Sequence, residues 1–226
     1  MTPRGILLDI EGATTPIAFV YDVLFPFARL RAGEYLKDAD LTGLKREHDE
    51  DVRHGNKPPA WSAAAVEYVH WLMDQDRKST ALKNIQGKIW LEGYRSGELH
   101  GEVFPDVAPA LERWAGNGID IRIFSSGSIL AQQLLFSSTA AGDLTTFLKG
   151  YFDTTTGPKH DPDSYRKIAD EFGVAPSEIM FISDIARELD AARSAEMQTL
   201  LCVRPGNHPQ PEHDHRTITS FDEIVV

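Results

Sequence analysis

The chain has 226 residues, of which 42 % are hydrophobic and 25 % charged, so it is long enough to bury a core without disulfides. Its formal charge of −11 at pH 7 argues against nucleic acid and anionic membranes as partners. No run of residues is long and apolar enough to span a membrane, and the N-terminus has no signal-peptide pattern. Since the single cysteine, Cys202, cannot form an internal disulfide, we expect a cytoplasmic protein and interpret Cys202 as a small buried hydrophobe.

The first expected element is a buried parallel strand, Gly5–Asp9, which ends in an acid. From about residue 19 to residue 100 the apolar residues take a helical spacing. One helical face carries Ala65, Val69, Leu72 and Met73, and another carries Leu82, Ile85 and Ile89. Between the helices we expect a charged loop over residues 48–59.

Beyond Gly101 the pattern alternates between helix and strand. Asp106 is expected to cap a helix that carries Val107, Leu111 and Trp114 inward. The other expected elements are a strand at Ile119–Phe124, a helix with Ile129, Leu130 and Leu134, a helix at Asp163–Phe172 stopped by Gly173, a strand at Ile179–Ile182, a helix through Leu189 and Ala192, and a strand at Thr199–Val203.

This alternation predicts the α/β class with a doubly wound parallel sheet. The helical stretch then becomes a cap domain inserted after the first strand. We therefore expect a core domain made of residues 1–18 and 101–226, which carries the active site, and a helical cap domain over residues 19–100.

Polar residues end three of the expected strands, namely Asp9, Ser125 and Asp184. The carboxyl ends of parallel strands open onto one crevice, where ligands bind in such sheets. Residues far apart in the sequence should therefore meet at one edge. The alternative for each of them is that its side chain only caps the helix that follows.

Asp9 and Glu11 place two carboxylates just past the first strand, and Gly12 lets the chain bend sharply there. Crowded carboxylates need a cation, and oxygen ligands favour Mg²⁺. A carboxylate can also attack phosphorus and divide hydrolysis into two steps through an acyl phosphate. Taken alone, the pattern Asp-x-Glu-Gly is weak evidence, because it occurs by chance in loops.

Three further features point to an anion. Ser125 and Ser126 precede a helix and offer hydroxyl and N–H groups for a phosphate, although a plain serine cap is the alternative. Lys159 lies in a loop restrained by Gly157 and Pro158, and would otherwise be a surface lysine. Asp184 could complete a metal site, or cap a helix.

Asp9-x-Glu11, Ser125, Lys159 and Asp184 resemble, in order, the four signatures of the haloacid dehalogenase superfamily. Within it the chain is similar to the acireductone synthases, also called enolase-phosphatases, over nearly its whole length. The segments that carry this closer resemblance are Leu8–Ile17, Val23–Ala28, Phe124–Ser128, Gln132–Phe136, Ser164–Ala169 and Val203–Asn207.

The resemblance implies one Mg²⁺ held by Asp9, Glu11 and Asp184, with Ser125, Ser126 and Lys159 binding the substrate and Asp9 as nucleophile. The implied substrate is 2,3-diketo-5-methylthiopentyl-1-phosphate, a small phosphate ester of methionine salvage, which is enolised and then dephosphorylated to the acireductone. The resemblance also implies a monomer. The sequence does not identify the base for enolisation.

Two positions depart from related patterns. Ala13 stands where this family usually has Thr, and Glu11 stands where other phosphatases of the superfamily carry Asp, as is usual in this family. An enol conjugated to a ketone is an easy leaving group, so the demand for a general acid falls. We therefore hypothesise that Glu11 serves the metal or the enolisation. The expected catalytic residues are Asp9, Glu11 and Lys159.

Some residues invite functional readings that we consider weaker. Phe19, Phe25 and Trp90 could contact the methylthio tail, although core packing is the better interpretation. His213 and His215 lie in a proline-containing tail that we expect to be a solvated loop rather than a zinc site. The helical insertion is expected to exclude water from the crevice.

Two alternative functions stay open at this stage. One is a magnesium-dependent phosphatase for another small sugar phosphate. The other is a catalytically silent binding module with the same fold, against which the intact Asp9, Lys159 and Asp184 argue.

Overall fold

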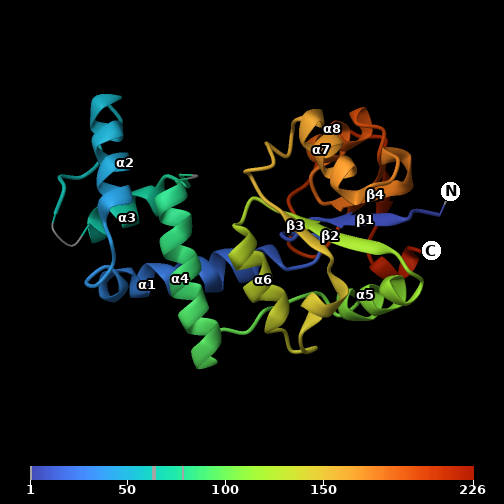
Figure 1. Cartoon of the computed structure of the whole chain (residues 1–226), viewed down its shortest axis with the longest axis horizontal. Helices are drawn as coiled ribbons and strands as arrows, with labels where there is room; N and C mark the ends of the chain where they lie inside the picture. Colours follow the sequence, from blue (N-terminus) through green and yellow to red (C-terminus); the bar gives the residue numbers. More distant parts are fainter. Residues whose placement is uncertain (1, 63–64, 78) are drawn as a thin grey trace. The chain divides into compact units, whose positions relative to one another are not determined.

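The computed structural model describes residues 2–62, 65–77 and 79–226. The chain divides into two compact units. The first, here called the core unit, is Met1–Val20 with His100–Val226, and the second, the inserted unit, is Tyr21–Leu99. Figure 1 labels the α-helices of both units and the strands β1 to β4.

A parallel sheet forms the centre of the core unit, with strand order β3-β2-β1-β4-β5-β6 among the described residues. The strands are β1 Gly5–Leu8, β2 Asp120–Phe124, β3 Gly150–Phe152, β4 Ile179–Ser183, β5 Gln198–Cys202 and β6 Arg216–Ile218. The order reverses between β1 and β4, the topological switch point where open α/β sheets bind ligands. The predicted α/β doubly wound sheet is thus confirmed.

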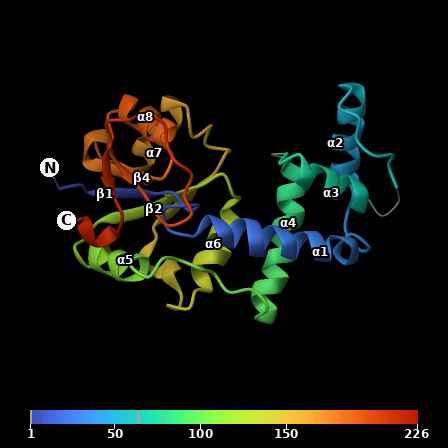
Figure 2. The same ribbon diagram turned by 180° about the vertical axis from the view of Figure 1, so that it is seen from behind.

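Helices cover both faces of this sheet, with α7 and α8 on one side and α5 on the other (Figures 1 and 2). The helices of the core unit are α5 Val107–Gly116, α6 Ile129–Ser137, α7 Pro162–Phe172 and α8 Ala186–Ser194. As predicted, α5 buries Val107, Leu111 and Trp114, and α7 ends at Gly173, whose φ of +68° suits glycine. These apolar faces account for both helices.

Asp106 differs from its predicted role as a helix cap. It occupies the position before α5, but its side chain makes no capping bond with the helix among the residues described here. Oδ2 of Asp106 instead accepts hydrogen bonds from Arg204 Nη2 at 2.8 Å and Phe221 N at 2.6 Å. A buried guanidinium outcompetes the helix N–H groups for this carboxylate because a charge-assisted bond is stronger.

The inserted unit contains the helices α1 Phe25–Tyr35, α2 Thr42–Arg53, α3 Val66–Asp74 and α4 Thr80–Ser96, and a helical turn, Phe19–Leu24, precedes α1. The two predicted apolar faces are confirmed in α3 and α4, where Val69, Leu72, Leu82 and Ile89 are buried. Ser79 begins α4 by accepting a hydrogen bond from Leu82 N at 2.9 Å.

The prediction of a charged loop over residues 48–59 is wrong in its first half, because α2 continues to Arg53. Leu44, His48 and Asp51 share the buried face of that helix at a helical spacing. Asp51 can remain ionised although it is buried, because Tyr68 and Arg77 donate hydrogen bonds to its carboxylate. A helix held by buried polar partners lacks the apolar pattern by which the sequence reveals a helix.

Cys202 is buried at the end of β5, as predicted, and burial raises its pKa to about 12. The segment after it is only partly solvated, contrary to the prediction. His215 is buried, and its ring nitrogens lie 2.9 Å from Thr199 Oγ1 and 3.1 Å from Asp190 Oδ1. Across the described ranges, no helix is long and apolar enough to cross a membrane.

Candidate active site

Asp9 and Asp184 follow the two neighbouring strands at the switch point of the sheet. Leu8 of β1 pairs in register with Ile182 of β4, so Asp9 lies beside Ser183, whose Oγ donates a hydrogen bond of 2.8 Å to Asp9 Oδ2. Both acids are 4 % exposed. The sheet therefore brings two buried carboxylates to the carboxyl ends of two neighbouring strands, as the sequence predicted for these two residues.

Gly12 fits the turn after β1 closely against Asp184. Its φ is +73°, and a Cβ built there would lie 2.6 Å from Asp184 Cγ. A larger residue would be both strained and in collision with the carboxylate. The need for a glycine at position 12 is thus explained by Asp184, which lies more than 170 residues further along the chain.

Lys159 joins the site from the loop before α7. Its Nζ lies 2.7 Å from Asp9 Oδ1 and 2.6 Å from Glu188 Oε2, and its side chain is 11 % exposed. Burial by itself would lower the pKa of this ammonium, but the charges of Asp9 and Glu188 outweigh burial and hold the pKa above its usual range. Lys159 is therefore a fixed cation rather than a surface lysine.

The loop that carries Lys159 is held against α7 by hydrogen bonds and by a close approach at Gly157. Ser164 Oγ donates a hydrogen bond of 2.8 Å to the carbonyl of Pro158, and Tyr165 Oη donates one of 2.7 Å to the carbonyl of Lys159. Gly157 has a φ of +151°, and a side chain there would overlap Ser164 Oγ. These contacts aim the lysine at the carboxylates.

Glu188 on α8 is a member of this cluster that the sequence reasoning missed. It accepts from Lys159 and lies 3.1 Å from Ser183 Oγ, and its side chain is 17 % exposed. Burial, and next the negative charge of Asp9, raise the pKa of Glu188 to about 7. In the sequence Glu188 is only an acid in the first turn of a helix, which gives no signal that it belongs to the site.

The acids of the cluster outnumber its single lysine. Burial, followed by the charge of Asp9, raises the pKa of Asp184 to about 7, because a third negative charge is costly there. Such an excess of buried oxygen acceptors fits a hard divalent cation. Among the residues described, however, no three His, Cys, Asp or Glu side chains are grouped as a ready ligand set, and Glu11 lies in the turn, bridged to Thr15.

Ser125 and Ser126 follow β2, next to β1 in the sheet. Ser125 is buried, and its Oγ accepts a hydrogen bond of 3.1 Å from Gly127 N. The capping role falls to Ser128, whose Oγ accepts from Ala131 N at 3.3 Å. Gln132 braces the loop from α6, donating bonds of 2.9 Å to Gly127 O and 2.8 Å to Phe152 O.

The aromatic residues weighed as tail contacts are engaged in packing. Trp90 is buried and its Nε1 donates a hydrogen bond of 2.8 Å to the carbonyl of Leu24. Phe25 stacks on Trp90 with ring centroids 6.3 Å apart, and Phe19 is 4 % exposed. The core interpretation of the sequence is therefore the better one for all three.

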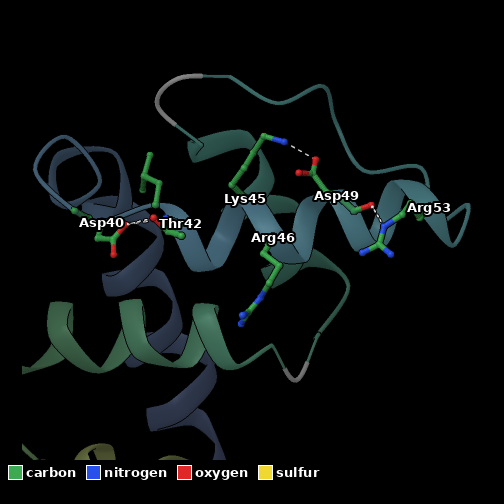
Figure 3. A pocket seen from close by; sticks show the side chains of 8 residues that line it. Asp40, Thr42, Lys45, Arg46, Asp49 and Arg53 are labelled. Atoms are coloured by element: carbon green, nitrogen blue, oxygen red, sulfur yellow. Dashed lines mark hydrogen bonds and ion pairs between the residues drawn. The ribbon is translucent and has the colours of Figure 1, made fainter.

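A separate hollow of about 760 Å³ lies along α2 of the inserted unit (Figure 3). Its lining residues include Lys45, Asp49 and Arg53, and Figure 3 shows Lys45 directed at Asp49 and Arg53 at the backbone of Asp49. These cations neutralise local acids, and all the labelled side chains lie near the surface. The hollow lacks the buried excess of negative charge found in the cluster of Asp9, Lys159, Asp184 and Glu188.

Comparison with known proteins agrees with this geometry. Residues 3–196 match the family model described as haloacid dehalogenase-like hydrolase. The "Enolase-phosphatase E1" of Synechococcus elongatus is 50 % identical over 97 % of this chain and 96 % of the relative. The "Probable bifunctional methylthioribulose-1-phosphate dehydratase/enolase-phosphatase E1" of Arabidopsis thaliana is 45 % identical over 98 % of this chain and 48 % of its own length.

The crystal structure of the UTR4 protein from Saccharomyces cerevisiae superposes with a TM-score of 0.82, at 30 % identity over 99 % of this chain and all of that chain. The similarity thus holds in sequence and in fold, and it spans both units. The chain belongs to the enolase-phosphatase E1 family of the haloacid dehalogenase-like hydrolases, and it is a phosphatase.

Proposed function

We propose that this protein is a bifunctional enolase-phosphatase that converts 2,3-diketo-5-methylthiopentyl-1-phosphate to the acireductone and inorganic phosphate, a step of methionine salvage. The observation that carries the proposal is the buried Asp9 carboxylate at the switch point, 2.7 Å from the ammonium of Lys159. The relatives named for this activity support it along the whole chain.

Asp9 and Asp184, with Glu11 from the turn between them, are the residues we propose to hold one Mg²⁺. The ion usually takes one or two carboxylates and keeps several waters, so the two buried acids with an oxygen of Glu11 suit it. When bound, it would balance the excess acid charge, draw charge from the phosphate and stabilise an enolate. The excess of acids over Lys159 supports this assignment.

In the hydrolysis, an oxygen of Asp9 attacks phosphorus and the P–O bond to the substrate breaks. The electron pair of that bond leaves with the enol oxygen, and Asp9 becomes an aspartyl phosphate. Water then attacks phosphorus, which releases inorganic phosphate and restores the Asp9 carboxylate. Ser125 and Ser126 would donate hydrogen bonds to the phosphoryl oxygens throughout.

Lys159 is suited to bind the same phosphate. Its ammonium has three N–H donors, and Asp9 and Glu188 receive two of them, which leaves the third for a phosphoryl oxygen. A cation already fixed by the protein stabilises the charge that develops in the transition state without further reorganisation.

Enolisation precedes hydrolysis in this proposal, because it converts the leaving group into a conjugated enol that departs easily. Such a leaving group needs little proton donation, so Glu11 serves the metal or the enolisation rather than acting as a strong general acid. A Glu11→Asp variant should lose part of the enolisation or hydrolysis rate, and a variant with both rates unchanged would contradict this role.

The decisive experiment follows the purified protein with the diketo phosphate and Mg²⁺, recording ultraviolet absorbance and released phosphate together. The conjugated enol gives a new absorbance, so both signals should appear, and Asp9→Asn should abolish phosphate release. Asp163→Asn, an exposed carboxylate on α7, is the control and should be fully active. Phosphate release without the absorbance change would favour a plain sugar phosphatase, and neither signal would favour a silent binding module.

The proposed division of labour places the chemistry in the core domain, residues 1–18 and 101–226, with residues 19–100 as the cap. All proposed ligands, binding residues and the nucleophile belong to the core unit. We further propose a cytoplasmic monomer, and light scattering that gave twice the chain's mass of 25.2 kDa would refute the monomer.

A further inference from the structure

Asn207 lies in the segment after β5, and its amide orientation is fixed by two backbone carbonyls. Nδ2 donates hydrogen bonds of 2.9 Å to Gly12 O and 3.2 Å to Cys202 O. If the amide were turned over, its oxygen would face these two acceptors and both bonds would be lost. The two donated hydrogen bonds therefore determine which end of the amide is the nitrogen and which is Oδ1.

The Oδ1 atom of Asn207 is buried and receives no hydrogen bond within the part of the chain that the structure describes. A Cβ built on Gly12 would lie 3.0 Å from this oxygen and 2.6 Å from Asp184 Cγ, so the amide oxygen and the Asp184 carboxylate approach the same point at Gly12. Both groups are acceptors when Asp184 is ionised. A buried acceptor without a donor is unfavourable, so the arrangement calls for a donor from outside the chain.

We propose that Asn207 is a positioning residue of the cation site, whose Oδ1 accepts a hydrogen bond from a water molecule on the Mg²⁺ held by Asp9 and Asp184. This inference rests on the magnesium site of the proposed function and adds a residue to it. Mg²⁺ gives up its waters reluctantly, and groups that hold those waters orient the ion.

The segment that carries Asn207 is anchored near the acid it serves. Gln210 Oε1 accepts a hydrogen bond of 3.0 Å from Ala186 N, at the start of α8 and two residues after Asp184. Arg204, buried at the other end of the segment, donates to the carbonyl of Ala13 at 3.2 Å. The segment thus ties the turn at Gly12 to the end of β4 from outside the strands.

Asn207→Ala tests the proposal through Mg²⁺ affinity in the absence of substrate. The dissociation constant is measured by titration calorimetry with MgCl₂, and the unfolding temperature is recorded with and without Mg²⁺. We expect the variant to bind Mg²⁺ about 10- to 100-fold more weakly than the wild type. Glu212→Gln, an exposed change in the same segment, serves as control, with an unchanged affinity expected.

Asn207→Asp separates the oxygen from the nitrogen. It keeps an acceptor at the position of Oδ1 and loses the two bonds from Nδ2, so it should unfold at a lower temperature yet bind Mg²⁺ at least tenfold more tightly than Asn207→Ala. If Asn207 only ties the two carbonyls, Asn207→Ala lowers the metal-free unfolding temperature and leaves Mg²⁺ affinity unchanged, which overturns the proposal. Asn207→Asp also decides the question if the alanine variant fails to fold, since weakened Mg²⁺ binding by this variant overturns it too.

The two levels of the proposal fail differently. A wild-type protein that does not bind Mg²⁺ would refute the metal site itself and this inference with it. Wild-type binding that persists at the same strength in Asn207→Ala would refute only the role of Asn207.

Discussion

Glu188 Oε2 lies 2.6 Å from Lys159 Nζ, and Asp9 Oδ1 lies 2.7 Å from the same ammonium. The lysine is therefore shared between a proposed nucleophile and a carboxylate that takes no other part in the reaction. Without Glu188, Asp9 would become the main partner of the ammonium, and its oxygens would be less free to attack phosphorus.

Glu188→Gln should lower kcat/KM for phosphate release by about 10- to 100-fold, because Lys159 loses its ion pair with Glu188 and is held less firmly. The change keeps the size of the side chain and removes only its charge. Phosphate release at saturating Mg²⁺ measures the effect, and Glu171→Gln, exposed on α7, is the control. Equal activity of the two variants would show that the ion pair is dispensable.

The raised pKa of Glu188 has a consequence for the stability of the metal-free protein. Its pKa is about 4.5 in the unfolded chain and about 7 in the fold, so between these values the folded state holds the extra proton. The free energy of unfolding should therefore fall as the pH rises from about 4.5 to about 7, by at most about 1.4 kcal/mol per pH unit from this group. Above about pH 7 Glu188 is ionised in both the folded and the unfolded state, so the full loss in the free energy of unfolding remains.

Denaturant unfolding of the wild type and of Glu188→Gln, both without metal, checks this dependence. The variant lacks the titrating group, so its stability relative to the wild type should increase over that pH window. A constant difference between the two proteins from pH 4.5 to pH 7.5 would mean that Glu188 titrates normally in the fold.

Gly12→Ala should weaken Mg²⁺ binding and abolish most of the activity, because the new methyl group would collide with the Asp184 carboxylate. The positive φ alone would cost about 1–2 kcal/mol. Gly173→Ala carries the same kind of strain, with φ +68° and open space around it, and controls for it. Calorimetric Mg²⁺ affinity distinguishes them, and a Gly12→Ala protein that behaved like Gly173→Ala would disprove the close approach.

Tyr165→Phe should lower both stability and kcat, because the hydroxyl that ties the carbonyl of Lys159 is lost. We expect a loss of about 1 kcal/mol in the free energy of unfolding and a severalfold loss in kcat. Tyr151→Phe is the matched control, since the buried Tyr151 hydroxyl has no partner within the described ranges. Urea unfolding measures the stability of both variants, and removal of the Tyr151 hydroxyl should be neutral or stabilising.

Arg204→Met should destabilise the core unit by about 3–5 kcal/mol, because the buried Asp106 carboxylate would lose its 2.8 Å ion pair. Arg193→Met breaks an exposed pair with Asp190 and should change stability by less than about 1 kcal/mol. Thermal unfolding followed by circular dichroism compares them. Similar losses in both variants would argue that the burial of Arg204 has no energetic weight.

The central strands and their acids were predictable because a buried strand has a continuous apolar pattern that ends abruptly. The strands β3 and β6 were missed, since three residues each give too short a pattern to recognise. Gly12 could be predicted as a bend, but the reason for it is Asp184, and only the register of β1 with β4 brings the two together.

Glu188 and Asn207 show where local pattern stops being informative about the site. Glu188 looks like any acid in the first turn of a helix, and its direction depends on how α8 packs on the sheet. Asn207 lies in a stretch rich in proline and histidine that resembles a solvated tail. Its importance comes from hydrogen bonds to the backbone carbonyls of Gly12 and Cys202. Gly12 is far away in the sequence, and no sequence pattern reveals a bond to a backbone carbonyl.

The central place of β1 also has a consequence for synthesis on the ribosome. This strand is made before both of its neighbours, so one of its edges stays unpaired until residues 120–123 have emerged and the other until residues 179–182 have emerged. Long-range parallel pairing is slow, and exposed strand edges invite association with other chains. Strand β1 therefore depends on segments that are translated later, and a chain truncated before β4 would leave an aggregation-prone edge in place of a finished enzyme.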